Sequence, residues 1–238
     1  IEADMSERND NDEPSKLFLV LESMIPLVAG LSFVVGFVLY TTVLSDLAAD
    51  DKLNSVETVE FLKENQAAYY ASNIVIYIIF GLAQLGLTIS ISKHASSSHE
   101  DHDMFNNYVY ALGVIWSGLV IAAGMIANVG ANAAIDMLET DPETAGLLWE
   151  TVITICRGVG GGNEIVGGLW VLGISWMWRR QCFLLYRTLA VIGVVAGVAG
   201  VVSMVPSLDT AGAVFGISMI VWYLLYSGTL LFVGAPKH

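Results

Sequence analysis

LFLVLESMIPLVAGLSFVVGFVLYTTVL, residues 17–44, is the stretch that decides the fold class of this chain. It carries a single charged residue, Glu22, among long apolar side chains. A helix rises about 1.5 Å per residue and needs about 20 apolar residues to cross the hydrocarbon core of a membrane. The stretch therefore predicts a membrane-spanning helix.

Five further blocks reach the length of a span. Four of them meet this length test directly: residues 71–92, 108–135, 184–205 and 211–233. The fifth, residues 147–178, contains several polar side chains but ends in WVLGISWMW, an apolar run with the aromatic residues typical of a membrane interface. We therefore expect an all-α, polytopic membrane protein: a six-transmembrane-helix bundle over residues 17–234, preceded by an acidic cytoplasmic tail, residues 1–16.

The amino-acid composition also indicates a protein embedded in lipid. Charged residues make up 14% of the chain, against about 25% in soluble domains, and hydrophobic residues 55%. The net charge of −13 comes from acids in the tail and loops, so no basic surface for nucleic acid is present. The two cysteines, Cys156 and Cys182, are expected to be free thiols.

No cofactor has a recognisable binding motif in the sequence. The predicted spans contain no histidine for a buried bis-histidine haem and no interior lysine for a retinal Schiff base. HExxH, GxSxG and the phosphate loop GxxxxGK(S/T) are absent. We expect no cofactor and no recognisable catalytic machinery.

The distribution of basic residues predicts the orientation. With both termini in the cytoplasm, the inner segments hold Arg8, Lys16, Lys93, Arg179, Arg180, Arg187 and Lys237. The outer segments hold only Lys52 and Lys63, and Arg157 falls within a span. The outer connection 45–70 alternates apolar and charged residues at helical spacing, which predicts an amphipathic helix between spans one and two, on the membrane surface or capping the bundle.

The stretch RGVGGGNE, residues 157–164, is the leading candidate for a functional site. A charge at membrane depth is costly, so Arg157 and Glu164 form a functional hypothesis. Seven residues of α-helix turn through about 700°, which places both on one face if the helix continues through the three glycines. A local unwinding there would free backbone groups that need protein or a wet cavity around them.

Counting depth along the spans suggests partners for these charges. Asn128 and Asn132 form a polar stripe in the third span, and Asn128 is expected at the depth of Arg157. Gln84 in the second span is expected level with Glu164. Together with Asn163, these residues predict a polar ligand-binding pocket between spans two, three and four. The alternative is that the same groups pair with one another and only fix helix register.

Two further stretches suggest roles in packing or metal binding. GVVAGVAG, residues 193–200, places small residues for close helix packing. KHASSSHEDHD, residues 93–103, offers His94, His99 and His102 as metal ligands, but its flexible serines and acids favour a solvated loop. We expect no metal site.

Three stretches resemble an uncharacterised prokaryotic family of six-span membrane proteins, catalogued as a domain of unknown function. They are VETVEFLKENQAAYYASNIVIYIIFGLAQLGLTISI (56–91), GGNEIVGGLWVLGISWMWRR (161–180), and LAVIGVVAGVAGVVSMVP (189–206) with VWYLLYSGTLLF (221–232). The resemblance implies a compact six-helix bundle in a prokaryotic inner membrane. It implies no activity, so no catalytic residue is transferred.

Two functions remain open from the sequence. The first is a non-enzymatic membrane protein that binds a small ligand, a lipid or a partner subunit, or assembles as a homo-oligomer. The second is a small transporter or channel that uses a broken fourth helix around Arg157 and Glu164. A membrane enzyme is disfavoured, because no nucleophile–base or metal constellation lies at one depth.

Overall fold

Long apolar helices make up most of the architecture, as the sequence predicts. The computed structural model describes residues 16–48, 53–95, 100–161, 164–205, 207–208 and 210–236, and every regular element in these ranges is helical. Five helices are long and apolar enough to cross a membrane: Leu17–Thr41, Gln66–His94, Met104–Leu138, Leu184–Val202 and Thr210–Phe232. The chain is therefore an all-helical, multi-pass membrane protein, and its predicted acidic tail lies almost wholly outside the described residues.

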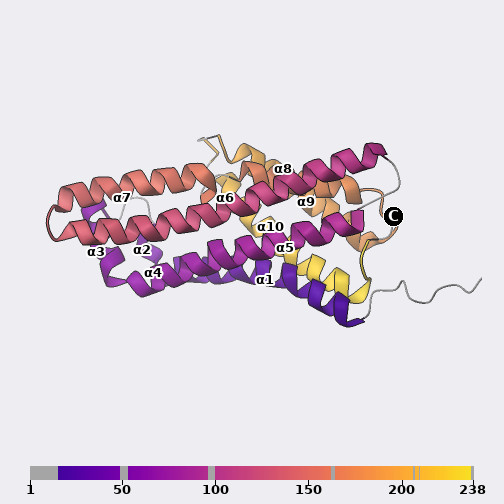
Figure 1. Cartoon of the computed structure of the whole chain (residues 1–238), viewed down its shortest axis with the longest axis horizontal. Helices are drawn as coiled ribbons and strands as arrows, with labels where there is room; N and C mark the ends of the chain where they lie inside the picture. Colours follow the sequence, from indigo (N-terminus) through magenta and orange to yellow (C-terminus); the bar gives the residue numbers. More distant parts are fainter. Residues whose placement is uncertain are drawn as a thin grey trace, which may run out of the picture.

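Six helices close into a ring. They are α1 (Lys16–Thr41), α5 (Phe80–Ala95), α6 (Glu100–Leu138), α8 (Ile165–Trp178), α9 (Leu184–Val202) and α10 (Thr210–Phe232). In this order each packs on the next, and α10 returns to α1. Figure 1 shows that α6, with 39 residues, runs along nearly the whole molecule, whereas the hairpin of α9 and α10 covers only part of that length.

The predicted span over residues 147–178 is interrupted. It consists of α7 (Pro142–Cys156), the π-helical segment η2 (Arg157–Gly161) and α8, which together run back along α6. Gly160 has φ +147°, a conformation that a residue with a Cβ rarely adopts, so the helix cannot continue through it. Neither α7 nor α8, with 15 and 14 residues, is long enough to cross a membrane alone.

The interior of the ring is filled by aromatic side chains. The rings of Trp178 and Trp222 stack with centroids 5.5 Å apart, and Trp170 meets both Trp222 and Trp116 at 5.8 and 5.6 Å. Beside them α8 and α9 approach closely, because a Cβ at Gly168 would lie 2.7 Å from the carbonyl oxygen of Gly197. The predicted packing role of the glycines in residues 193–200 is confirmed.

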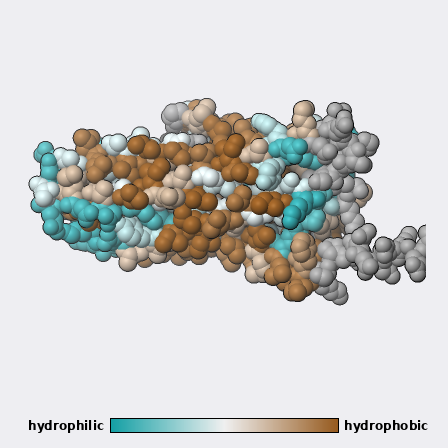
Figure 2. Space-filling model, in the orientation of Figure 1, coloured by the Kyte–Doolittle hydropathy of each residue, from teal (hydrophilic) through white to brown (hydrophobic). Residues whose placement is uncertain are grey.

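A second core lies at the end of the bundle where α6 turns into α7. Here α2 (Ser45–Ala48), α3 (Ser55–Glu64), α4 (Gln66–Asn73) and the π-helical η1 (Ile74–Ile79) follow α1. Val59 and Leu62 of α3 are fully buried against the ends of α6 and α7. We call α2, α3 and α4, with the adjoining ends of α6 and α7, the capping layer. Figure 2 shows hydrophilic residues at this end and also on the other side of a broad hydrophobic belt.

Candidate functional site

A cavity of about 500 Å³ lies between the capping layer and the ring, and Arg157 reaches it. Its walls come from the end of α1, from α2, α3, α4 and η1, and from α7 with η2. The lining residues are Tyr40, Asp46, Leu47, Leu53, Ser55, Thr58, Tyr69, Ile76, Tyr77, Trp149, Glu150, Ile153 and Arg157. This volume falls within the range of about 300–1,000 Å³ that small-molecule sites occupy.

Helix α7 presents one stripe of side chains to this cavity. Glu150, Ile153 and Arg157 follow one another at the i, i+3, i+7 spacing of a helix face. The backbone of Arg157 still has helical angles, φ −61° and ψ −39°, so the regular spacing extends to it. Glu150 and Arg157 are therefore on the same side of α7, roughly 10 Å apart along its axis.

Both π-helical segments of the described chain border the cavity. Segment η1 contributes Ile76 and Tyr77, and η2 begins with Arg157. A π-helical turn is uncommon and occurs frequently at functional sites. Here the two wide turns face the same space from different helices.

The lining combines aromatic rings, hydroxyl groups and charges of both signs. Tyr69 and Trp149 meet edge to face with centroids 5.9 Å apart, and both are largely buried. The Ser55 hydroxyl donates a hydrogen bond to Oε1 of Glu150, which ties α3 to α7. Such a wall can hold a polar molecule that also has apolar surface.

Glu164 lies away from this cavity. The helical break separates it from Arg157, so the condition for a shared helix face, an unbroken helix through the glycines, is not met. The backbone N–H of Glu164 donates to Oγ of Ser203, 3.0 Å away, directly after α9 ends. Glu164 therefore sits at the level of the turn between α9 and α10.

The predicted amide partners have other neighbours. Asn128 accepts a 2.9 Å hydrogen bond from Nδ2 of Asn73, and Asn132 contacts Tyr70 and Asp136 at 3.3 and 3.0 Å. Gln84 is fully buried in the ring. It accepts a 2.7 Å hydrogen bond from the Tyr223 hydroxyl and donates to Thr88 at 3.3 Å.

Of the five predicted site residues that the structure describes, it brings only Arg157 to the cavity. Asn128, Asn132 and Gln84 do not line it, and Asn163 lies outside the described residues. The expected pocket between spans two, three and four is instead bordered by α1, η1 and α7, with no lining residue from α6. Sequence reasoning missed Tyr40, Asp46 and Trp149, whose placement depends on how the capping layer folds back.

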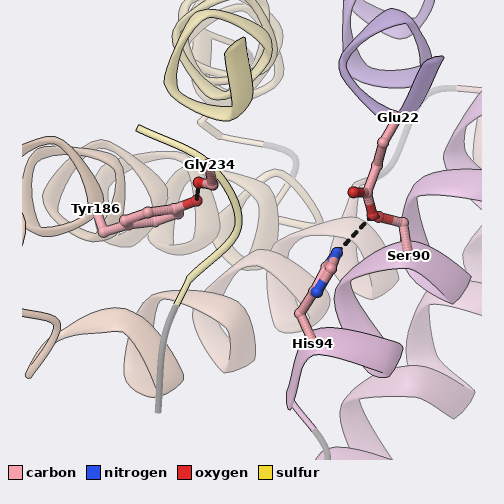
Figure 3. Close-up of polar contacts among 5 residues, drawn as sticks. All are labelled: Glu22, Ser90, His94, Tyr186 and Gly234. Atoms are coloured by element: carbon pink, nitrogen blue, oxygen red, sulfur yellow. Dashed lines mark hydrogen bonds and ion pairs between the residues drawn. The ribbon is translucent and has the colours of Figure 1, made fainter. Parts of the chain in front are cut away.

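A separate polar cluster joins α1 to α5 at the opposite end of the ring. Figure 3 shows the Glu22 carboxylate accepting from the Ser90 hydroxyl, with Nε2 of His94 2.7 Å from the same oxygen. Glu22 is only 6% exposed, and these contacts make it an interhelical partner of α5. Helix α5 continues to Ala95, beyond the expected end of span two, and therefore includes His94. In the same view the Tyr186 hydroxyl donates to the carbonyl of Gly234 at 2.6 Å.

Among the described residues, no group of three or more histidine, cysteine, aspartate or glutamate side chains could hold a metal ion. His99 and the side chain of His102 lie outside the described residues. Cys156 is buried and Cys182 exposed, and both are free thiols as predicted.

No protein-family model matches the chain, and neither a curated protein nor a solved structure matches it.

Proposed function

We propose that this protein binds a small ligand in the Arg157 cavity and has no catalytic machinery. The cavity itself carries the proposal, because it joins a useful volume to hydroxyl, carboxylate, guanidinium and aromatic groups. It replaces the intramembrane pocket expected around Asn128 and Gln84. The chain is surrounded by the lipid bilayer. A partner subunit or a second copy of the chain could bind in response to the ligand.

The proposed topology has six spans, with α7, η2 and α8 together forming the fourth crossing. Its support is the closed ring, in which α8 fills the place between α6 and α9. The split of basic residues favours both termini in the cytoplasm of a prokaryotic inner membrane, which places the capping layer outside. In this arrangement α3 is the amphipathic helix between spans one and two. Membership of the six-span family that the sequence resembles is part of the same proposal.

Transport is the second candidate, and the break at Gly160 favours it. Broken helices commonly form substrate sites in transporters. However, the ring inward of the break is occupied by Trp116, Trp170 and Trp222, and the last two are fully buried. A path across the membrane would require these rings to separate, so binding is the better-supported function.

A pocket-blocking variant tests the binding function. Thr58 lines the cavity from α3, whereas Glu60 on the same helix is exposed and does not. We expect compounds that raise the melting temperature of the purified protein to lose this effect in Thr58→Trp and to keep it in Glu60→Trp. A varied panel of cations, anions, zwitterions and neutral solutes that shows no Thr58-dependent stabilisation would contradict the proposal. Flux into proteoliposomes, abolished by Thr58→Trp, would favour transport instead.

A further inference from the structure

We infer that the ligand of the Arg157 cavity is a zwitterion, a molecule that carries an ammonium and an acid group together. This inference rests on the proposed function and specifies the chemistry of that same site. It follows from the signs, the spacing and the surroundings of the charged lining residues.

The first argument is the balance of charge. Among the described lining residues, Asp46 and Glu150 are acidic and Arg157 is basic. A simple anion would approach Arg157 but also two carboxylates, and a simple cation would meet the guanidinium. Glu150 and Arg157 are exposed and Asp46 is half-buried, so each of these charges can attract or repel a charged ligand in the cavity. A ligand with both signs satisfies both kinds of lining group.

The second argument is the spacing of the opposite charges along α7. Glu150 and Arg157 share a face roughly 10 Å apart, with the apolar Ile153 between them. The Glu150 carboxylate is already held by Ser55 of α3, which fixes it towards the capping layer. The cavity wall therefore has a negative end and a positive end, separated by an apolar residue. A ligand that carries two linked charges of opposite sign would match this pattern.

The third argument is the chemistry at each end. Arg157 offers a planar fork of N–H donors that suits a carboxylate or phosphate group. Around the rest of the cavity stand the rings of Tyr40, Tyr69, Tyr77 and Trp149. Aromatic faces attract ammonium groups, and several rings around one cavity form the type of cage that holds a quaternary ammonium.

A matched set of probes of similar shape separates the possibilities. Trimethylglycine carries both charges, choline lacks the carboxylate, and 3,3-dimethylbutyrate replaces the ammonium nitrogen by carbon. Binding is measured by calorimetry and thermal unfolding of the full chain in a maltoside detergent. We expect trimethylglycine to bind at least about tenfold more tightly than either single-charge analogue, because each analogue lacks one of the two charges that the acidic and basic lining residues would attract. The inference would be overturned if choline or 3,3-dimethylbutyrate bound as tightly as, or more tightly than, the best-bound zwitterion among trimethylglycine and the phosphocholine described below.

Phosphocholine, added to the same set, distinguishes a lipid headgroup from a free solute. Binding of phosphocholine without trimethylglycine assigns the site to a headgroup, and the reverse assigns it to a free solute. Either result supports the shared zwitterionic chemistry, whereas binding of neither probe overturns it.

Variants then locate the effect. Arg157→Met and Glu150→Gln should each weaken trimethylglycine or phosphocholine binding by about tenfold or more, while Arg187→Met, an exposed change on α9, leaves it intact. An unchanged affinity in both cavity variants would overturn the inference. If Thr58-dependent binding is found only for ligands of another charge class, the zwitterion inference fails and the proposed function stands. If no compound of any class shows such binding, both fail.

Discussion

The closed ring and the capping layer solve the same packing problem in opposite ways. In the ring, glycine brings helices into backbone contact and tryptophan fills what remains, as at Gly168 and Trp222. In the capping layer, short helices fold over the ends of longer ones and leave a cavity of about 500 Å³. The comparison shows that the closest helix packing and the room for a ligand lie in different parts of the bundle.

The largest expected loss of stability comes from removing a tryptophan side chain from the interior of the helix ring. Trp222 is fully buried between Trp170 and Trp178, and its indole nitrogen has no hydrogen-bond partner in the described chain, so Trp222→Ala removes packing alone. We expect a loss of about 3–5 kcal/mol in the free energy of unfolding.

Two matched substitutions sharpen this contrast. Trp149→Ala should cost less than Trp222→Ala, because Trp149 borders the cavity, and the 58% exposed Trp176 should tolerate alanine best. Denaturation of the three variants in detergent gives the order. Equal losses for Trp149 and Trp222 would remove the proposed difference between the two regions.

The next effect concerns the contact between α8 and α9. In Gly168→Ala the new Cβ would meet the carbonyl oxygen of Gly197 at 2.7 Å, so the helices must separate. Overpacking of this kind costs about 1–3 kcal/mol. Gly216→Ala in α10 is the control, since nothing lies within 4 Å of its added Cβ, and it should be neutral or slightly stabilising. The melting temperatures of the two variants provide the measurement, and a stable Gly168→Ala protein would argue against tight packing here.

The smallest effect is a pH dependence in the capping layer. Lys63 of α3 lies 3.0 Å from Glu139, and its hydrogen bond and charge lower the pKa of this exposed carboxyl. A carboxyl whose pKa is lower in the folded state stabilises the fold above its unfolded-state pKa, and this contribution is lost as the pH falls through the folded-state value. Glu139→Gln should therefore be slightly less stable than wild type at neutral pH and indistinguishable from it in acid. A stability difference that grows on acidification would contradict this assignment.

The sequence was most informative where a single helix decides the outcome. The apolar blocks located five long helices, and the three glycines after Arg157 marked the break, because both signals are local. The polar partners were harder to assign. Gln84 bonds to Tyr223 and Asn128 to Asn73, and counting depth along separate spans does not reveal which helices become neighbours.

The cavity escaped prediction for the same reason. Tyr40, Asp46 and Glu150 belong to three elements that meet only after the chain has folded back over α1 and α7. No periodicity within one segment encodes that meeting. Arg157 was found because a charge in an apolar block is conspicuous by itself.

The length of α6 has a mechanical consequence. At about 1.5 Å per residue its 39 residues extend for roughly 58 Å, almost twice the hydrocarbon thickness of about 30 Å. Even a tilt of about 40° leaves this helix extending beyond the hydrocarbon core into the headgroup regions. Because α6 is unbroken, a tilt of this helix at its capping-layer end must displace its other end, beside α5. The segment that returns along α6, from α7 through η2 to α8, is broken at Gly160. An unbroken helix and a broken one therefore lie side by side.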